Sequence, residues 1–144
     1  MYKCKNVKQA YRRHDQLRRQ KHWVTQMVHR IRRSRTRACR IHASGDFDYA
    51  WYVRKWIEIA AQCPETTFVF YTRSWTRPRL LPHLVRLARL PNVFGWFSCD
   101  ASMPRPPRLR GVRRAYMMVH DRDRPHYAVD LIFRTRHKTP LKRV

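Results

Sequence analysis

Apolar residues recur at helical spacing over the first part of the chain. Between residues 6 and 33 they are three, four or seven positions apart, which places them on one face of a helix whose other face is rich in arginine. The apolar positions are Val7, Ala10, Tyr11, Leu17, Val24, Met27, Val28 and Ile31. The spacing predicts one long, basic, amphipathic helix that is interrupted at Ser34.

Short strand-like segments alternate with helix-like segments over residues 38–98. The pattern predicts strands at 38–43, 66–72 and 93–98, and helices at 50–61 and 80–90. Pro64 ends the first of these helices, and Pro82 suits the first turn of the second. Segment 66–72 is apolar on both faces, which predicts a central strand covered on both sides. Such alternation is typical of a parallel sheet.

Two further strand candidates, at 115–119 and 127–133, follow a proline-rich, basic connection at 103–108. The predicted fold class is therefore α/β. It consists of a parallel β-α-β-α-β sheet, as a partial β/α barrel or an open three-layer arrangement, with a long basic helix before it and a β-rich tail after it. The expected units are a basic amphipathic helix at 1–37, a β/α core domain at 38–120, and a basic C-terminal strand and tail at 121–144, mobile from Arg134 onward.

The net charge says more about function than the length of the chain does. The 144 residues suit one compact unit and include 33 Lys and Arg against 9 Asp and Glu, a net charge of +24. Residues 1–40 and 101–144 carry most of the excess, and 26 of the 33 cations are Arg, which binds phosphate in a bidentate manner. The charge predicts DNA or RNA as partner, with incidental surface charge as the alternative. The predicted phosphate contacts are Arg12, Arg13, Arg18, Arg19, Arg32, Arg33, Arg105, Arg108 and Arg110.

Several common classes of function are excluded by the residue pattern. Three glycines cannot form a Walker loop or a dinucleotide fingerprint, and the usual hydrolase motifs do not occur. Cys4, Cys39, Cys63 and Cys99 are too widely spaced for a zinc ribbon or an iron–sulfur cluster, so no metal and no cofactor is predicted. No segment approaches the roughly 18 apolar residues of a membrane helix. We expect a cytoplasmic protein without a membrane partner.

Polar residues follow each of the three predicted core strands. Because ligands collect at the carboxyl ends of parallel strands, these residues are expected to line one pocket. The candidate catalytic residues are Asp46, Arg73 and Asp100, and the candidate ligand pocket comprises His42, Ser44, Asp46, Thr72, Ser74 and Ser98. Two carboxylates, an arginine and hydroxyls could hold a charged small molecule or a metal. The alternative is that Asp46 and Asp100 form turns and helix caps.

Several blocks of the sequence resemble the phage and plasmid family called gene product eighty-eight. The most specific is Ile-His-Ala-Ser-Gly-Asp-Phe at 41–47, and the resemblance covers roughly residues 1–118. The other blocks lie at 52–60, 71–75, 80–82, 90–93 and 97–100. The family is similar in layout to radical S-adenosylmethionine barrels, in which a segment like 44–47 faces the cofactor. The resemblance implies a shortened member, with S-adenosylmethionine or an iron–sulfur cluster implied only for a longer chain.

The favoured interpretation is a nucleic-acid-associated basic protein of a phage or other mobile element, which binds phosphate backbones through its arginine-rich flanks. One alternative is an enzyme of the radical S-adenosylmethionine barrel type, with Asp46, Arg73, Ser98 and Asp100 as its binding shell. A third makes the basic flanks a surface for an acidic protein partner. Whether the chain is an enzyme is left open by the sequence.

Overall fold

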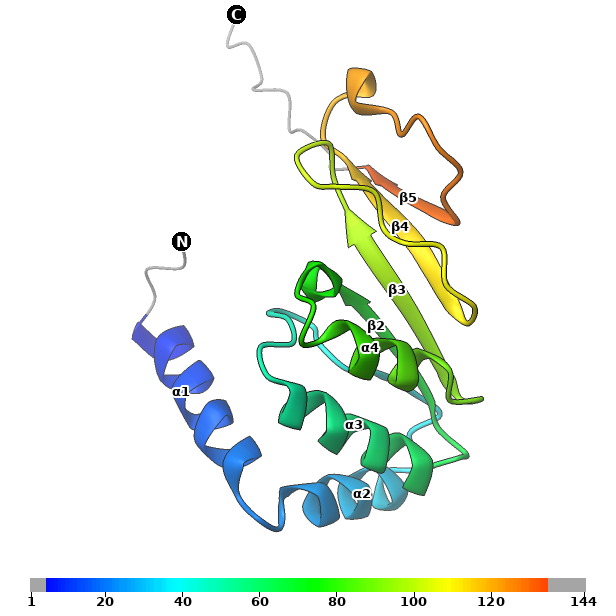
Figure 1. The fold of residues 1–144 in the computed structure, drawn as a ribbon. Helices are drawn as coiled ribbons and strands as arrows, with labels where there is room; N and C mark the ends of the chain where they lie inside the picture. Colours follow the sequence, from blue (N-terminus) through cyan, green and yellow to red (C-terminus); the bar gives the residue numbers. More distant parts are fainter. Residues whose placement is uncertain (1–4, 135–144) are drawn as a thin grey trace, which may run out of the picture.

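Five strands form one parallel sheet in the order in which they occur in the sequence (Figure 1). The computed structural model describes residues 5–134. The strands are β1 (Ala38–Arg40), β2 (Thr67–Thr72), β3 (Val93–Cys99), β4 (Val112–Met118) and β5 (Leu131–Arg134). The helices are α1 (Lys5–Arg19), α2 (Trp23–Arg33), α3 (Ala50–Gln62) and α4 (Leu81–Ala88), with single 3-10 turns at Ser74–Thr76 and Asp121–Asp123.

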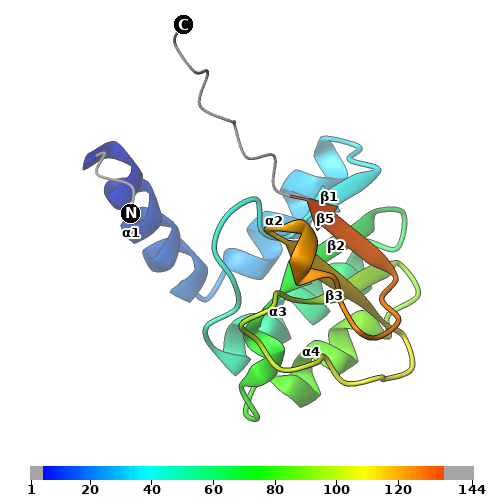
Figure 2. The same ribbon diagram turned by 90° about the horizontal axis from the view of Figure 1, so that it is seen from above.

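The sheet curls into a half-barrel, so the predicted α/β class and partial barrel are confirmed (Figure 2). Helices α3 and α4 provide the crossovers from β1 to β2 and from β2 to β3, as the alternation of segments predicted. Strands β4 and β5 also pair in parallel with their neighbours, but the connections that lead to them contain no α-helix. Loops thus take the place of helices over the second half of the sheet.

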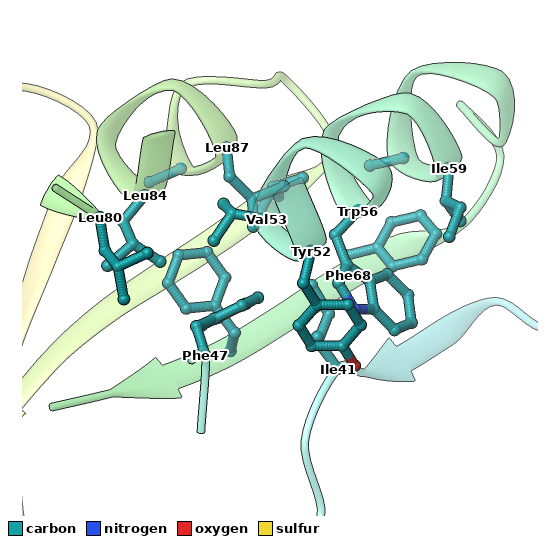
Figure 3. Close-up of a cluster of buried hydrophobic side chains, with 14 of the residues drawn as sticks. Ile41, Phe47, Tyr52, Val53, Trp56, Ile59, Phe68, Leu80, Leu84 and Leu87 are labelled. Carbon is teal, nitrogen blue, oxygen red and sulfur yellow. The ribbon is translucent and has the colours of Figure 1, made fainter. Parts of the chain in front are cut away.

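The core lies between the sheet and its helices. Phe70 of β2 is fully buried in this core. Phe68 of β2 is also fully buried beneath the helices, and Val53 and Trp56 of α3 pack onto the same layer (Figure 3). Their rings meet edge to face, as in the contact between Trp56 and Phe68. Alternation along β2 and β3 sends every second side chain into this layer. The remaining side chains of these strands point to the inside of the curl.

Residues 5–33 form two helices, so the prediction of one long helix is wrong. The polar residues between Arg19 and Trp23 have no apolar group to bury, and the helix turns there. Lys55 Nζ of α3 donates to the carbonyl oxygens of Arg18 (2.6 Å) and Gln20 (3.1 Å). These carbonyls at the end of α1 would otherwise lack partners. The break lets α2 pack on α3, while α1 stands apart from the sheet (Figures 1 and 2).

Within residues 5–134, strand β2 is covered on one side only, which corrects the expectation of cover on both. Phe68, Phe70 and Thr72 are buried against the helical layer, whereas Thr67, Val69 and Tyr71 are half-buried on the concave side. A half-barrel has no second wall to complete the burial of its inner face. The apolar character of that inner face is therefore not explained by packing in the described part of the chain.

Close packing of α4 on β3 depends on one glycine. A Cβ atom at Gly95 would lie 2.6 Å from Cζ of Phe70 and 2.6 Å from Cβ of Ala88. Both distances are shorter than nonbonded carbon atoms tolerate. Gly95 thus lets the α4 backbone approach the centre of the sheet.

The C-terminal unit predicted at 121–144 is described only in part. Strand β5 pairs with β4 in the same sheet, and residues 135–144 of the predicted mobile tail lie outside the described residues. None of the helices between residues 5 and 134 has both the length and the apolar character of a membrane-spanning helix.

Candidate functional site at the carboxyl ends of the strands

Asp46 joins the loop after β1 to the end of β2. Its Oδ1 accepts hydrogen bonds from Thr72 Oγ1 (2.5 Å) and from the backbone N–H of Phe47 (2.7 Å). Its Oδ2 accepts from the backbone N–H of Arg73 (2.8 Å). The carboxylate therefore holds two loops together.

Arg73 extends this network to the end of β3. Its Nη2 lies 2.8 Å from Asp100 Oδ2, while Asp100 Oδ1 accepts from the backbone N–H (2.9 Å) and Oγ (2.5 Å) of Ser102. The hydrogen bond from the Ser102 hydroxyl and, more weakly, the charge of Arg73 lower the pKa of Asp100. The structure thus brings Asp46, Arg73 and Asp100 together, with Arg73 in contact with both carboxylates. Their contacts hold the loops that follow β1, β2 and β3 in position.

The hydroxyls of the predicted pocket are also used within the chain. Ser74 Oγ is buried and donates to the Phe47 carbonyl oxygen (2.6 Å), and the backbone N–H of Ser74 donates to Thr72 Oγ1 (3.0 Å). Ser98 Oγ donates to the Thr72 carbonyl oxygen (3.2 Å). These contacts fix the relative positions of the β1, β2 and β3 ends.

His42 and Ser44, in contrast, face a separate cavity beside α1. This cavity of about 490 Å³ is lined by Ala10, Tyr11, His14, Ile41, His42, Ala43 and Ser44. Tyr11 of α1 donates to Ser44 Oγ (2.7 Å). The predicted single pocket is therefore divided into a polar network and a mostly apolar cavity. No local motif marks Tyr11 or His14 as wall residues, because only the packing of α1 against the β1 loop brings them there.

Burial lowers the pKa of His42 to about 4 from its ordinary value of 6.5. Its ring packs edge to face on Phe47 with centroids 4.5 Å apart, and its Nε2 lies 3.3 Å from the Tyr52 hydroxyl. Because the unfolded chain binds a proton at higher pH than the folded chain does, this group stabilises the fold above pH 6.5 and destabilises it as pH falls toward 4.

Acidification from neutral pH to about pH 5 is therefore expected to cost about 2 kcal/mol of unfolding free energy through His42. Urea denaturation at the two pH values measures this loss. His42→Phe keeps a ring against Phe47 and should flatten the dependence, while His29→Gln, at an exposed position, should leave it unchanged. An equal pH dependence in the His42→Phe variant would contradict the assignment.

The predicted phosphate-binding arginines are mostly on the surface. Arg12, Arg13 and Arg33 are exposed on α1 and α2, and Arg105, Arg108 and Arg110 are exposed on the loop between β3 and β4. Arg19 Nε pairs with Asp15 (3.0 Å), and Arg32 donates to the Gln62 carbonyl oxygen (2.7 Å). These two side chains remain exposed but already have protein partners.

Arg18 differs from the other eight, because its guanidinium is buried. It pairs with both oxygens of Asp48 and with Asp15, and it lies 4.5 Å from the centre of the Tyr52 ring. The hydrogen bond to Asp48 is the main cause that raises the pKa of Arg18. The sequence pattern could not single it out from its neighbours, since its partner Asp48 is 30 positions away. Its structural role is to tie α1 to the segment before α3.

A metal cluster is not formed by the side chains between residues 5 and 134, where no three His, Cys, Asp or Glu groups gather at one point. Cys39, Cys63 and Cys99 are free thiols, and burial raises the pKa of each. Cys99 Sγ lies 3.0 Å from the Tyr127 hydroxyl. Cys4 lies outside the described residues.

The comparison with protein-family models agrees with the resemblance noted in the sequence. A search of curated protein sequences and of solved structures finds no significant match. The family model for Gene product 88 matches residues 1–142, nearly the whole chain. The block at 41–47, which carries the resemblance most specifically, contains Asp46 and Phe47, both of which join the β1 loop to β2 and its neighbours. The chain belongs to the Gene product 88 family.

Proposed function

We propose that this protein associates with nucleic acid and binds its phosphate backbone through surface arginines. The observation that supports the proposal is the scarcity of acidic partners. Among the side chains that the structure describes, the arginines that form ion pairs are Arg18, Arg19 and Arg73. Arg32 and Arg89 donate to the carbonyl oxygens of Gln62 and Arg110. Most of the other exposed guanidinium groups that the structure describes keep their hydrogen-bond donors for a partner that carries negative charge.

The first basic surface is on α1. Arg12 and Arg13 are exposed on the outer side of this helix, and Lys21 follows in the exposed turn before α2. Because Arg18 and Lys55 fasten the end of α1 to α3, the helix is held at the periphery rather than packed into the core. A helix in this position can lie along a phosphate backbone without moving the fold.

A second basic surface is the loop between β3 and β4. Arg105, Arg108 and Arg110 are exposed there, and the Arg105 guanidinium lies 4.8 Å from the centre of the Tyr127 ring. Prolines at 104, 106 and 107 restrict this loop, so less conformational entropy is lost when it contacts a partner. Both surfaces offer charge and hydrogen-bond donors but no arrangement for reading base edges, so we expect little discrimination between sequences.

Binding to DNA and RNA, followed by fluorescence anisotropy over a salt series, tests the proposal. The affinity is expected to fall steeply as salt rises, because each neutralised phosphate releases about 0.9 counterion. Replacing Arg12 and Arg13 together with glutamine should reduce the slope of log K against log salt by about 2. The matched control replaces Arg54 and Arg86 with glutamine. These residues are exposed on α3 and α4, and their replacement removes the same charge.

Equal loss of slope in the two double variants would mean that only net charge matters, and would contradict an α1 surface. Weak binding of the wild type at physiological salt would overturn the proposal as a whole. Polyglutamate serves as the comparison ligand. If it binds as tightly as DNA at matched salt, the acidic-protein alternative replaces the nucleic-acid proposal.

A further inference from the structure

The concave side of the half-barrel carries a row of cationic and aromatic side chains. Strand pairing places Tyr71 of β2, Trp96 of β3 and Arg113 of β4 at one level of the sheet. Arg40 of β1 stands beside Tyr71, and Phe94 lies two positions before Trp96 on the same face. These five residues, here called the concave row, come from four strands.

The members of the concave row contact one another. The Tyr71 and Trp96 rings are stacked, with centroids 5.7 Å apart and planes 21° apart. The Arg40 guanidinium lies 5.5 Å from the centre of the Tyr71 ring, and the Arg113 guanidinium lies 4.5 Å from that of Phe94 and 5.5 Å from that of Trp96. The rings and the cations thus hold each other in position before any ligand binds.

This face is apolar yet accessible. Phe94 is 37% exposed, and Met117 and Phe133, which line the same side of β4 and β5, are 36% and 39% exposed. Phe133 also meets Tyr71 edge to face across the curl at 5.3 Å, so the two sides of the concave face are close together. Large apolar side chains left exposed in a contiguous patch mark an interaction surface rather than a core.

The charge of the concave face indicates which kind of ligand it can bind. Among the described residues of β1 to β5, the side chains on the concave face include Arg40 and Arg113 but no Asp or Glu. At the rim, Asp100 is neutralised by Arg73, whose Nη2 also lies 3.8 Å from Met117 Sδ. A ligand that matches this face therefore combines flat apolar groups with negative charge.

We infer that the concave row binds single-stranded nucleic acid, with bases on the aromatic side chains and phosphates at Arg40 and Arg113. Unpaired bases offer flat faces to aromatic rings, whereas a duplex keeps those faces inside its own stack. The inference rests on the proposed function but adds a preference that backbone contacts alone do not give. Phosphate contacts through α1 treat single strands and duplexes alike apart from their charge density.

The test compares binding of an oligonucleotide of about 12 nucleotides, as DNA and as RNA, with binding of the corresponding duplex at one salt concentration. The wild type is expected to bind the single strands more tightly. The double variant Tyr71→Leu/Trp96→Leu should lose about tenfold or more in single-strand affinity, with duplex affinity unchanged. Phe94→Leu changes a more exposed position and should cause a smaller loss of single-strand affinity. This variant provides the test if the double variant does not fold.

The matched control is Tyr49→Leu/Trp51→Leu. These rings are also stacked and also lie next to an arginine, Arg19, but they are placed at the junction of α1 and α3. This control should keep the wild-type preference for single strands. A preference that survives in the concave double variant, or an equal loss for single strand and duplex, would overturn the inference while leaving the proposed function intact.

Two other outcomes are distinguishable. If the wild type binds neither single strands nor duplexes, the proposed function fails and the inference fails with it. If sedimentation of the free protein shows a dimer that Tyr71→Leu/Trp96→Leu dissociates, a second copy of the chain covers the concave row. That result would also overturn the inference.

Discussion

Replacing Phe47 with alanine is expected to lower the free energy of unfolding by about 3–5 kcal/mol. The ring is 1% exposed and packs edge to face on Phe70, with centroids 5.5 Å apart, and on His42. Its removal leaves a cavity where the β1 loop meets the core, and the loop cannot close it because the backbone of residue 47 is held by Asp46 and Ser74. Urea denaturation followed by circular dichroism measures the loss.

Tyr49→Ala is the matched control for this prediction. Tyr49 belongs to the same loop and is also aromatic, but its side chain is 46% exposed, so its replacement should cost less than about 1 kcal/mol. Similar losses in the two variants would show that the loop as a whole, rather than the buried ring, is the source of the stability.

Gly95→Ala is expected to cost about 2–3 kcal/mol, although it adds a single methyl group. The new Cβ would lie 2.6 Å from both Phe70 Cζ and Ala88 Cβ, so the Phe70 ring or helix α4 must shift. The ring cannot rotate away freely, because Phe70 is fully buried and meets Phe47 on another side. Equilibrium unfolding measures the cost.

A double-mutant cycle with Phe70→Leu separates this clash from a general intolerance of β3. Leucine at position 70 lacks the Cζ atom that the new methyl group would meet, so the double variant should lose less stability than the sum of the two single variants. Additive losses would contradict the steric explanation. They would indicate instead that the Ala88 contact, or the backbone of β3, sets the cost of a side chain at position 95.

The order of elements could be predicted from the sequence because each core element repeats its apolar residues at one period. The helix predicted at 50–61 is Ala50–Gln62, and the strand predicted at 93–98 is Val93–Cys99. The first helix was predicted wrongly for the opposite reason. Its apolar stripe resumes in the same phase after the polar residues at the break. The hydrogen bonds from Lys55 that satisfy the carbonyl groups exposed there come from α3, so no local pattern contains them.

The candidate site could be predicted where position along the chain determines position in space. Asp46, Arg73 and Asp100 each follow a strand of the same parallel sheet, so their proximity follows from topology. The cavity wall at Tyr11 and the burial of Arg18 could not be predicted, because both depend on how α1 docks. The concave row could not be predicted either. The strands of a half-barrel and of a closed barrel have the same apolar pattern, so the sequence does not tell whether their inner face is open.

An unclosed sheet has free edges, and the edge at β1 is protected from strand addition. Strand β1 is three residues long, so an incoming strand would find few backbone groups with which to pair. Arg37 and Arg40 are exposed at its two ends and would repel the same edge of a second copy. The short, charged β1 thus disfavours the addition of a further strand at this edge of the sheet.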